Sequence, residues 1–132
     1  MISQTDTLEE CYEYMLSFAA RGLSAEPGSQ RDGEVRGYLS RAVDALRSLG
    51  PACADLITEA GLQPAATYKA FFDVLMDDAN RAATAIDIVL VQAIMTPQLL
   101  DNLNACMHLR ALLTDLFLVT EILKPHESPV TQ

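Results

Sequence analysis

Apolar residues recur at three- and four-residue steps along most of the chain, and this spacing restricts the fold to helices that each bury one face. The pattern runs through residues 8–19, 35–49, 68–95 and 96–124. The β-branched run 88–95 could instead form a buried strand, but no second strand is evident with which it could pair. We therefore predict an all-α protein.

Proline and glycine divide this pattern into four main helices. Gly50-Pro51 interrupts the second helix, and Thr96-Pro97 is typical of a helix start because threonine caps and proline suits the first turn. Pro125 should end the last helix. We predict a four-helix-type bundle with up-down connections and a second helix broken at Gly50-Pro51, formed by residues 1–124 and followed by a disordered tail over residues 125–132.

Length and charge limit the functional classes. The 132 residues, half of them hydrophobic, suffice for one domain with its own core. The net charge of −9 disfavours binding to a phosphate backbone. Four arginines interleave with acidic residues, which predicts a solvated helix face, namely Arg31, Arg36, Arg41 and Arg47.

The cysteines and the N-terminal sequence predict a soluble, cytoplasmic protein. Cys11, Cys53 and Cys106 are odd in number and widely spaced, which favours core thiols over disulfides. The first residues show no basic and apolar leader, and no apolar stretch is long enough to cross a bilayer.

The last predicted helix carries apolar residues on more than one side. A helix on the outside of a small bundle needs one apolar stripe, so the excess predicts a surface for a protein partner or a homodimer. Burial of this helix among the others remains the alternative. The expected interaction residues are Ile88, Val91, Ile94, Met95, Leu112, Leu116, Val119 and Leu123.

Polar residues embedded in the last two apolar segments need partners if they are buried. Counting outward from a turn at Thr96 brings Asp87 near His108 and Arg81 near Asp115. We therefore expect two buried polar pairs, Asp87 with His108 and Arg81 with Asp115, that fix the register of the two helices.

The chain shows no arrangement typical of catalysis or of a metal centre. Histidines and cysteines lack the short spacing of zinc ligands, and no phosphate-binding glycine loop follows a strand. Asp73, Asp77 and Asp78 are interpreted as a solvated face. We expect no catalytic residue, no metal and no cofactor.

Residues 57–71, Ile-Thr-Glu-Ala-Gly-Leu-Gln-Pro-Ala-Ala-Thr-Tyr-Lys-Ala-Phe, resemble the helix-turn-helix of tetracycline-repressor-type regulators. The resemblance lies in the Ala-Gly-Leu turn and in Tyr68 and Phe71, three residues apart, and covers about a tenth of the chain. It implies DNA binding through the helix after the turn. Lys69 is the only basic residue between Arg47 and Arg81, so phosphate contacts would be few.

These observations predict a small acidic regulatory or adaptor protein that sequesters or bridges a protein partner through an apolar helical surface. One alternative is a bundle that binds an apolar small molecule, and the second is a divergent helix-turn-helix regulator. In the small-molecule alternative the pocket would be lined by aromatic and sulfur residues, namely Tyr12, Met15, Phe18, Tyr38, Phe71, Phe72, Met76 and Met107.

Overall fold

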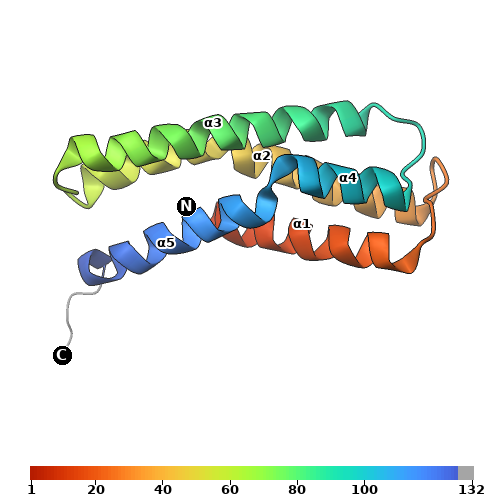
Figure 1. Ribbon diagram of the computed structural model, residues 1–132, viewed down its shortest axis with the longest axis horizontal. Helices are drawn as coiled ribbons and strands as arrows, with labels where there is room; N and C mark the ends of the chain where they lie inside the picture. Colours follow the sequence, from red (N-terminus) through yellow and green to blue (C-terminus); the bar gives the residue numbers. More distant parts are fainter. Residues whose placement is uncertain (128–132) are drawn as a thin grey trace.

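The computed structural model describes residues 1–127, with side chains to Lys124, and shows an all-helical chain (Figure 1). The helices are α1 (Ile2–Arg21), α2 (Gln30–Glu59), α3 (Ala65–Leu90), α4 (Pro97–Met107) and α5 (Leu109–Glu127). The prediction of an all-α protein is confirmed. None of these helices is long and apolar enough to span a membrane.

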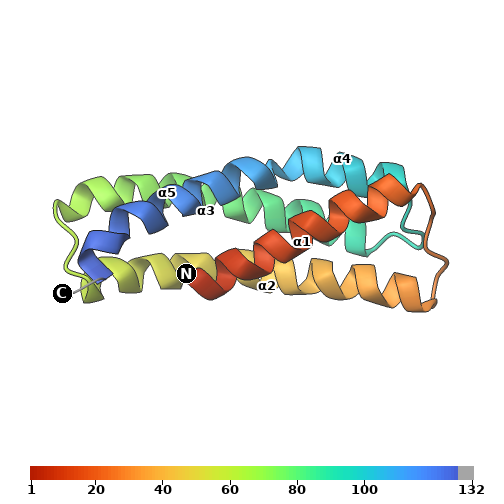
Figure 2. The same ribbon diagram turned by 90° about the horizontal axis from the view of Figure 1, so that it is seen from below.

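The long helices α2 and α3 pack side by side in opposite directions, and the other three helices cover them (Figures 1 and 2). α1 begins about midway along α2, where the side chain of Gln4 bonds to the hydroxyl of Ser48 at 3.1 Å, and then crosses toward α4. α4 and α5 follow each other along the remaining side. All five helices therefore enclose one elongated core.

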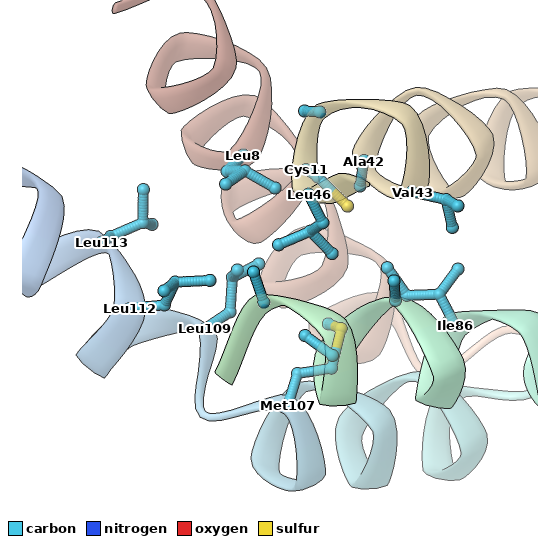
Figure 3. Packing of buried hydrophobic residues seen from close by; sticks show 14 of the residues in the cluster. Leu8, Cys11, Ala42, Val43, Leu46, Ile86, Met107, Leu109, Leu112 and Leu113 are labelled. Carbon is cyan, nitrogen blue, oxygen red and sulfur yellow. The ribbon is translucent and has the colours of Figure 1, made fainter. Parts of the chain in front are cut away.

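The core is mainly aliphatic and receives side chains from every helix (Figure 3). Leu8, Leu46, Ile86, Met107 and Leu112 all belong to this core, one from each helix in turn. All of these except Met107 were placed on an apolar helix face by the sequence pattern, because residues three or four apart share one side of a helix. The periodicity thus predicts the inward sides of α1, α2 and α3.

Two of the three cysteines belong to this core. Cys11 and Cys53 are buried, as expected, and burial raises the pKa of the Cys11 thiol to about 12 although the charge of Arg41 lowers it. Cys106 is exposed, so its prediction as a core thiol is wrong. It lies in the last turn of α4, whose buried face passes through Leu103 and Met107 instead.

The expected break at Gly50-Pro51 is absent, because α2 continues through both residues to Glu59. Proline removes one backbone hydrogen bond and crowds the preceding turn, but the apolar face continues across it through Leu49 and Cys53. Packing against α3 outweighs the local preference for a break. The two helices approach each other closely at Gly50, since a Cβ at this position would lie 3.1 Å from Cε of Met76 on α3.

The last two predicted helices differ from the expectation at the end of α3 and at His108. α3 ends at Leu90, and residues 91–95 form a loop rather than a further helical turn. Thr96 caps α4 as predicted, its hydroxyl accepting from the backbone N–H of Leu99, with Pro97 in the first turn. The expected continuous helix then breaks at His108, which takes the left-handed conformation with φ 51° and ψ 40°.

The C-terminal part of the last helix also differs, because α5 continues past Pro125 to Glu127, the last described residue. Proline therefore does not stop this helix at Lys124. The rest of the predicted tail, residues 128–132, lies outside the described residues.

Candidate functional site

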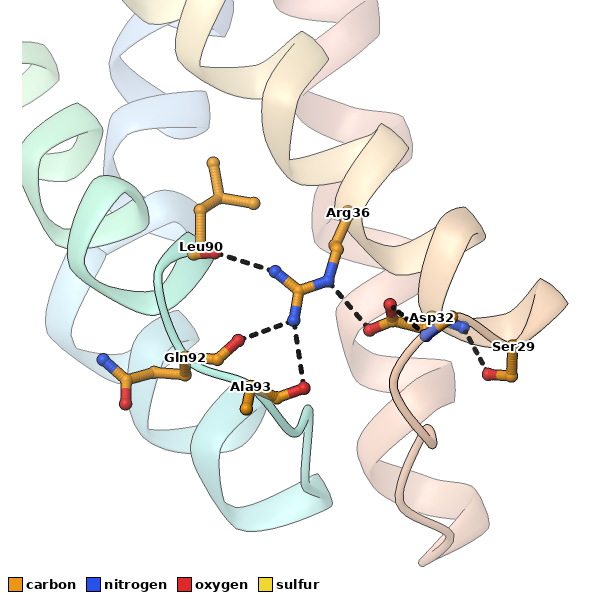
Figure 4. A network of polar contacts seen from close by, with 7 residues as sticks. Ser29, Asp32, Arg36, Leu90, Gln92 and Ala93 are labelled. Carbon is orange, nitrogen blue, oxygen red and sulfur yellow. Dashed lines mark hydrogen bonds and ion pairs between the residues drawn. The ribbon is translucent and has the colours of Figure 1, made fainter.

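Arg36 of α2 holds the loop between α3 and α4 (Figure 4). Its guanidinium donates to three backbone carbonyls, those of Leu90 at 2.7 Å, Gln92 at 2.6 Å and Ala93 at 3.3 Å. The remaining nitrogen, Nε of Arg36, donates to Asp32 at 2.8 Å. Because the guanidinium is planar and rigid, these bonds fix the loop relative to α2.

Asp32 holds this arginine in position from the first turn of α2. The carboxylate is buried and also accepts a hydrogen bond from the backbone N–H of Gly28 at 3.2 Å. The backbone N–H of Asp32 donates to the capping hydroxyl of Ser29 at 3.0 Å. Burial by itself would raise the pKa of Asp32, but the hydrogen bonds from Arg36 and Gly28 and the charge of Arg36 lower it below its ordinary value. The carboxylate is thereby kept charged opposite the guanidinium.

Two loops meet at this end of the molecule and expose aliphatic side chains. The backbone N–H of Ala25 donates to the carbonyl of Met95 at 2.8 Å, which joins the α1–α2 loop to the α3–α4 loop. The exposed fractions are 78% for Val91, 65% for Ile88, 62% for Leu23 and 48% for Ile94. We call these four residues the loop surface; Ile88 lies in the last turn of α3 and the other three lie in the two loops.

A second arginine secures the α1–α2 loop. Arg31 donates to the carbonyls of Leu23 and Ser24, and its guanidinium carbon lies 4.0 Å from the centre of the Phe18 ring. Exposed aliphatic groups on both loops are therefore carried by backbone that arginines of α2 hold in place.

The predicted interaction residues are divided between this end and the core. Ile88, Val91 and Ile94 are exposed and belong to the loop surface. The other five predicted residues are buried within the monomer, namely Met95, Leu112, Leu116, Val119 and Leu123. After the break at His108, the four of these residues that lie on α5 face the protein's own core, which was the alternative that the sequence left open.

The two predicted polar pairs do not form. Asp87 pairs with Arg47 of α2, and His108 is exposed at the end of α4. Arg81 is exposed. The pKa of Asp115 is raised, mainly by burial and in addition by the neighbouring negative charge of Asp78. Counting from Thr96 failed because the loop and the helix break shift the register.

An open polar cleft of about 630 Å³ lies beside the helix break. Its walls include Tyr12, Asn104, His108 and Asp115. The side-chain oxygen of Asn104 is buried without a hydrogen-bond partner among the described residues and could accept a bond from a polar ligand. Among all the residues that the structure describes, no three His, Cys, Asp or Glu side chains gather closely enough to hold a metal.

The residues named for a small-molecule pocket do not share one cavity. Met15 and Phe18 are packed in the core, Tyr12 lines the polar cleft, and Met76 lies against Gly50. Only Phe71 and Phe72 of that set line a common apolar hollow.

The segment that resembles a helix-turn-helix spans the turn between α2 and α3. In that DNA-binding motif the two helices cross at a steep angle, whereas α2 and α3 lie side by side along their length (Figures 1 and 2). The resemblance therefore does not extend to the arrangement of the helices.

Sequence reasoning missed the structural role of Arg36. The residue was assigned to a solvated face because acidic residues flank it, and one of these, Asp32, is indeed its partner. Its other partners are backbone carbonyls, which no side-chain pattern records. No protein-family model, curated protein or solved structure matches the chain.

Proposed function

We propose that the chain is a small acidic regulatory or adaptor protein that binds a protein partner through the loop surface. One observation carries this proposal: large aliphatic side chains are exposed on a loop whose backbone is held by three hydrogen bonds from Arg36. Surface loops that a rigid scaffold positions often carry binding residues, and groups that are held in place before binding lose less entropy in a complex.

Anchoring matters because it reduces the ordering that binding would otherwise require. A flexible loop loses conformational entropy when a partner fixes it, whereas a prearranged loop loses little. The hydrogen bonds to the carbonyls of Leu90, Gln92 and Ala93 keep Val91 at the surface. Removal of the side chains of Val91, Ile88 and Ile94 from water then supplies the driving force for binding the partner.

The finer architecture belongs to the same proposal. We treat the molecule as a four-helix-type bundle in which α4 and α5 together occupy the fourth position. A second copy of the chain is one candidate for the partner, since homodimers are the commonest oligomers. A dimer through the loop surface would bury Val91 against its counterpart.

Site-specific photo-crosslinking tests the surface directly. A benzophenone amino acid replaces Val91 in one variant and Val74 in the control; Val74 is likewise an exposed aliphatic residue, but it lies on α3 away from the two loops. In the native cell extract, the Val91 variant should yield a defined crosslinked product that the Val74 variant does not. Its mass distinguishes a second copy from another protein.

Substitution provides the second part of the test. Val91→Asp should abolish the crosslink formed from a benzophenone at Ile94, while the helical circular dichroism stays unchanged because Val91 is largely exposed. An equal crosslinking pattern from Val74 and Val91, or a crosslink that persists in Val91→Asp, would contradict the proposal.

A further inference from the structure

The far end of the molecule contains an apolar groove that the loop surface does not involve. The groove lies between the first turns of α3 and the C-terminal part of α5, and its volume is about 340 Å³. We call it the α3–α5 groove; its apolar walls are formed by Tyr68, Phe71, Phe72, Leu118, Val119 and Ile122.

One wall of the groove belongs to a helix that is apolar on two sides. α5 buries Leu116 and Leu123 in the core, yet Leu118 remains 50% exposed and Ile122 42% exposed. The inner stripe satisfies the core, so the second stripe is left on the surface. The sequence predicted an apolar excess on this helix but assigned it to Leu112, Leu116, Val119 and Leu123, which are buried, and not to Leu118 or Ile122.

The groove is large enough for side chains from a partner helix. A cavity of about 150 Å³ accommodates one benzene-sized group, so about 340 Å³ provides room for two such groups. The α3 wall extends from Pro64 to Phe72, about two helical turns. Two large side chains one turn apart on an amphipathic helix match this length.

The segment that supplies the α3 wall of the groove is acidic, which indicates which kind of helix would suit it. Residues 51–78, which end α2 and begin α3, contain five carboxylates and a single basic residue, Lys69. That lysine is paired with Asp73 at 2.9 Å, and Lys124 on α5 is paired with Glu121 at 3.0 Å. The five carboxylates are Asp55, Glu59, Asp73, Asp77 and Asp78.

We propose that the α3–α5 groove binds a basic amphipathic helix of a protein partner. The apolar face of that helix would lie against Phe71 and Leu118, and its lysines or arginines would meet the carboxylates of the α2–α3 end. The arginines of this chain lie mostly within residues 21–47, toward the opposite end. Together with the loop surface, the groove would give the molecule two docking regions at its two ends.

A designed peptide provides the probe. It has about 18 residues, about five helical turns, with leucines at three- and four-residue spacing and lysines elsewhere. Two controls accompany it: a scrambled peptide of the same composition, and a peptide with glutamate in place of lysine. Affinity for the full chain is measured by fluorescence anisotropy, and the site is located by amide chemical-shift mapping.

The amphipathic lysine peptide should bind about tenfold or more tightly than either control, and the shifts should map to residues 64–72 and 118–122. Leu118→Gln should weaken binding by about tenfold, the effect of losing one well-packed aliphatic contact. The matched control Val74→Gln changes an exposed aliphatic residue of α3 outside the groove and should leave affinity unchanged.

Three results would overturn the proposal. Equal binding of the scrambled peptide would show that net charge alone causes binding, without recognition of an apolar helix face. Equal binding of the glutamate peptide would show that the carboxylates do not select a basic helix. A dimer of the free chain that Leu118→Gln dissociates would assign the groove to a second copy. Val91→Asp should not alter peptide binding, so this proposal and the loop-surface proposal fail or succeed separately.

Discussion

The guanidinium of Arg36 donates a hydrogen bond of 2.7 Å to the carbonyl oxygen of Leu90, which lies 54 positions later in the chain. Leu90 is the last residue of α3, and the final carbonyls of a helix have no partner within it. A cation there also interacts favourably with the negative end of the helix dipole. A side chain of α2 thus stabilises the end of α3 and positions the loop that follows.

Arg36→Lys should weaken this connection while keeping the charge. Lysine carries a single ammonium and cannot bond to Asp32 and three carbonyls with the planar geometry of arginine. We expect a loss of about 1–3 kcal/mol in the free energy of unfolding measured in urea, and faster hydrogen exchange of amides 91–96. Arg47→Lys, at the exposed pair with Asp87, is the matched control and should change stability by less than about 0.5 kcal/mol.

Asp32 should make the loop sensitive to acid. Its pKa in the folded protein is lowered below 3.8, so its contribution to stability is complete above the ordinary pKa and is lost as the pH falls through the folded value. Asp32→Asn should therefore be less stable than the wild type near neutral pH. The two unfolding curves should converge on acidification, and a constant difference down to about pH 2 would refute this role.

Asp115 should show the opposite dependence. Burial and the charge of Asp78 raise its pKa, so the ionised carboxylate is unfavourable in the folded state and stability is gained as the pH falls through the raised value. Asp115→Asn should raise the melting temperature near neutral pH. The gain should shrink toward acidic pH, and a gain that is independent of pH would contradict this explanation.

Pro51 lies inside α2, where it lacks the N–H that would complete the helical ladder. Pro51→Ala restores a donor and removes the crowding of the preceding turn, so the free energy of unfolding should rise by about 1–3 kcal/mol. Thermal unfolding measures the change. A destabilised variant would show that the core depends on a bend at this position.

The sequence predicted those features that depend on neighbouring residues. The inward faces of α1, α2 and α3 and the start of α4 at Thr96 follow from periodicity and from capping chemistry, which act within one or two turns. The continuation of α2 through Pro51 does not, because it is decided by packing against α3.

The candidate site depended on contacts between distant segments. The exposure of Val91 was consistent with its place in the predicted interaction set, but Leu116 of the same set is buried. The burial of Leu116 follows from the turn at His108, where no glycine or proline marks the break. The sequence also gives no sign of the bonds from Arg36 to the carbonyls of the α3–α4 loop, since every residue carries a carbonyl.

His108 joins α4 to α5 in a conformation that suits glycine, because a Cβ crowds the backbone at positive φ. His108→Gly should therefore stabilise the folded protein by up to about 1 kcal/mol, and His108→Val should destabilise it by about 1–2 kcal/mol, since a β-branched residue tolerates this region least. The imidazole is exposed, so losing it costs little packing. Urea midpoints of the two variants give the comparison. If valine matched the wild type, α4 and α5 would have to form one straight helix, and the buried stripe of α5 would turn away from its own core.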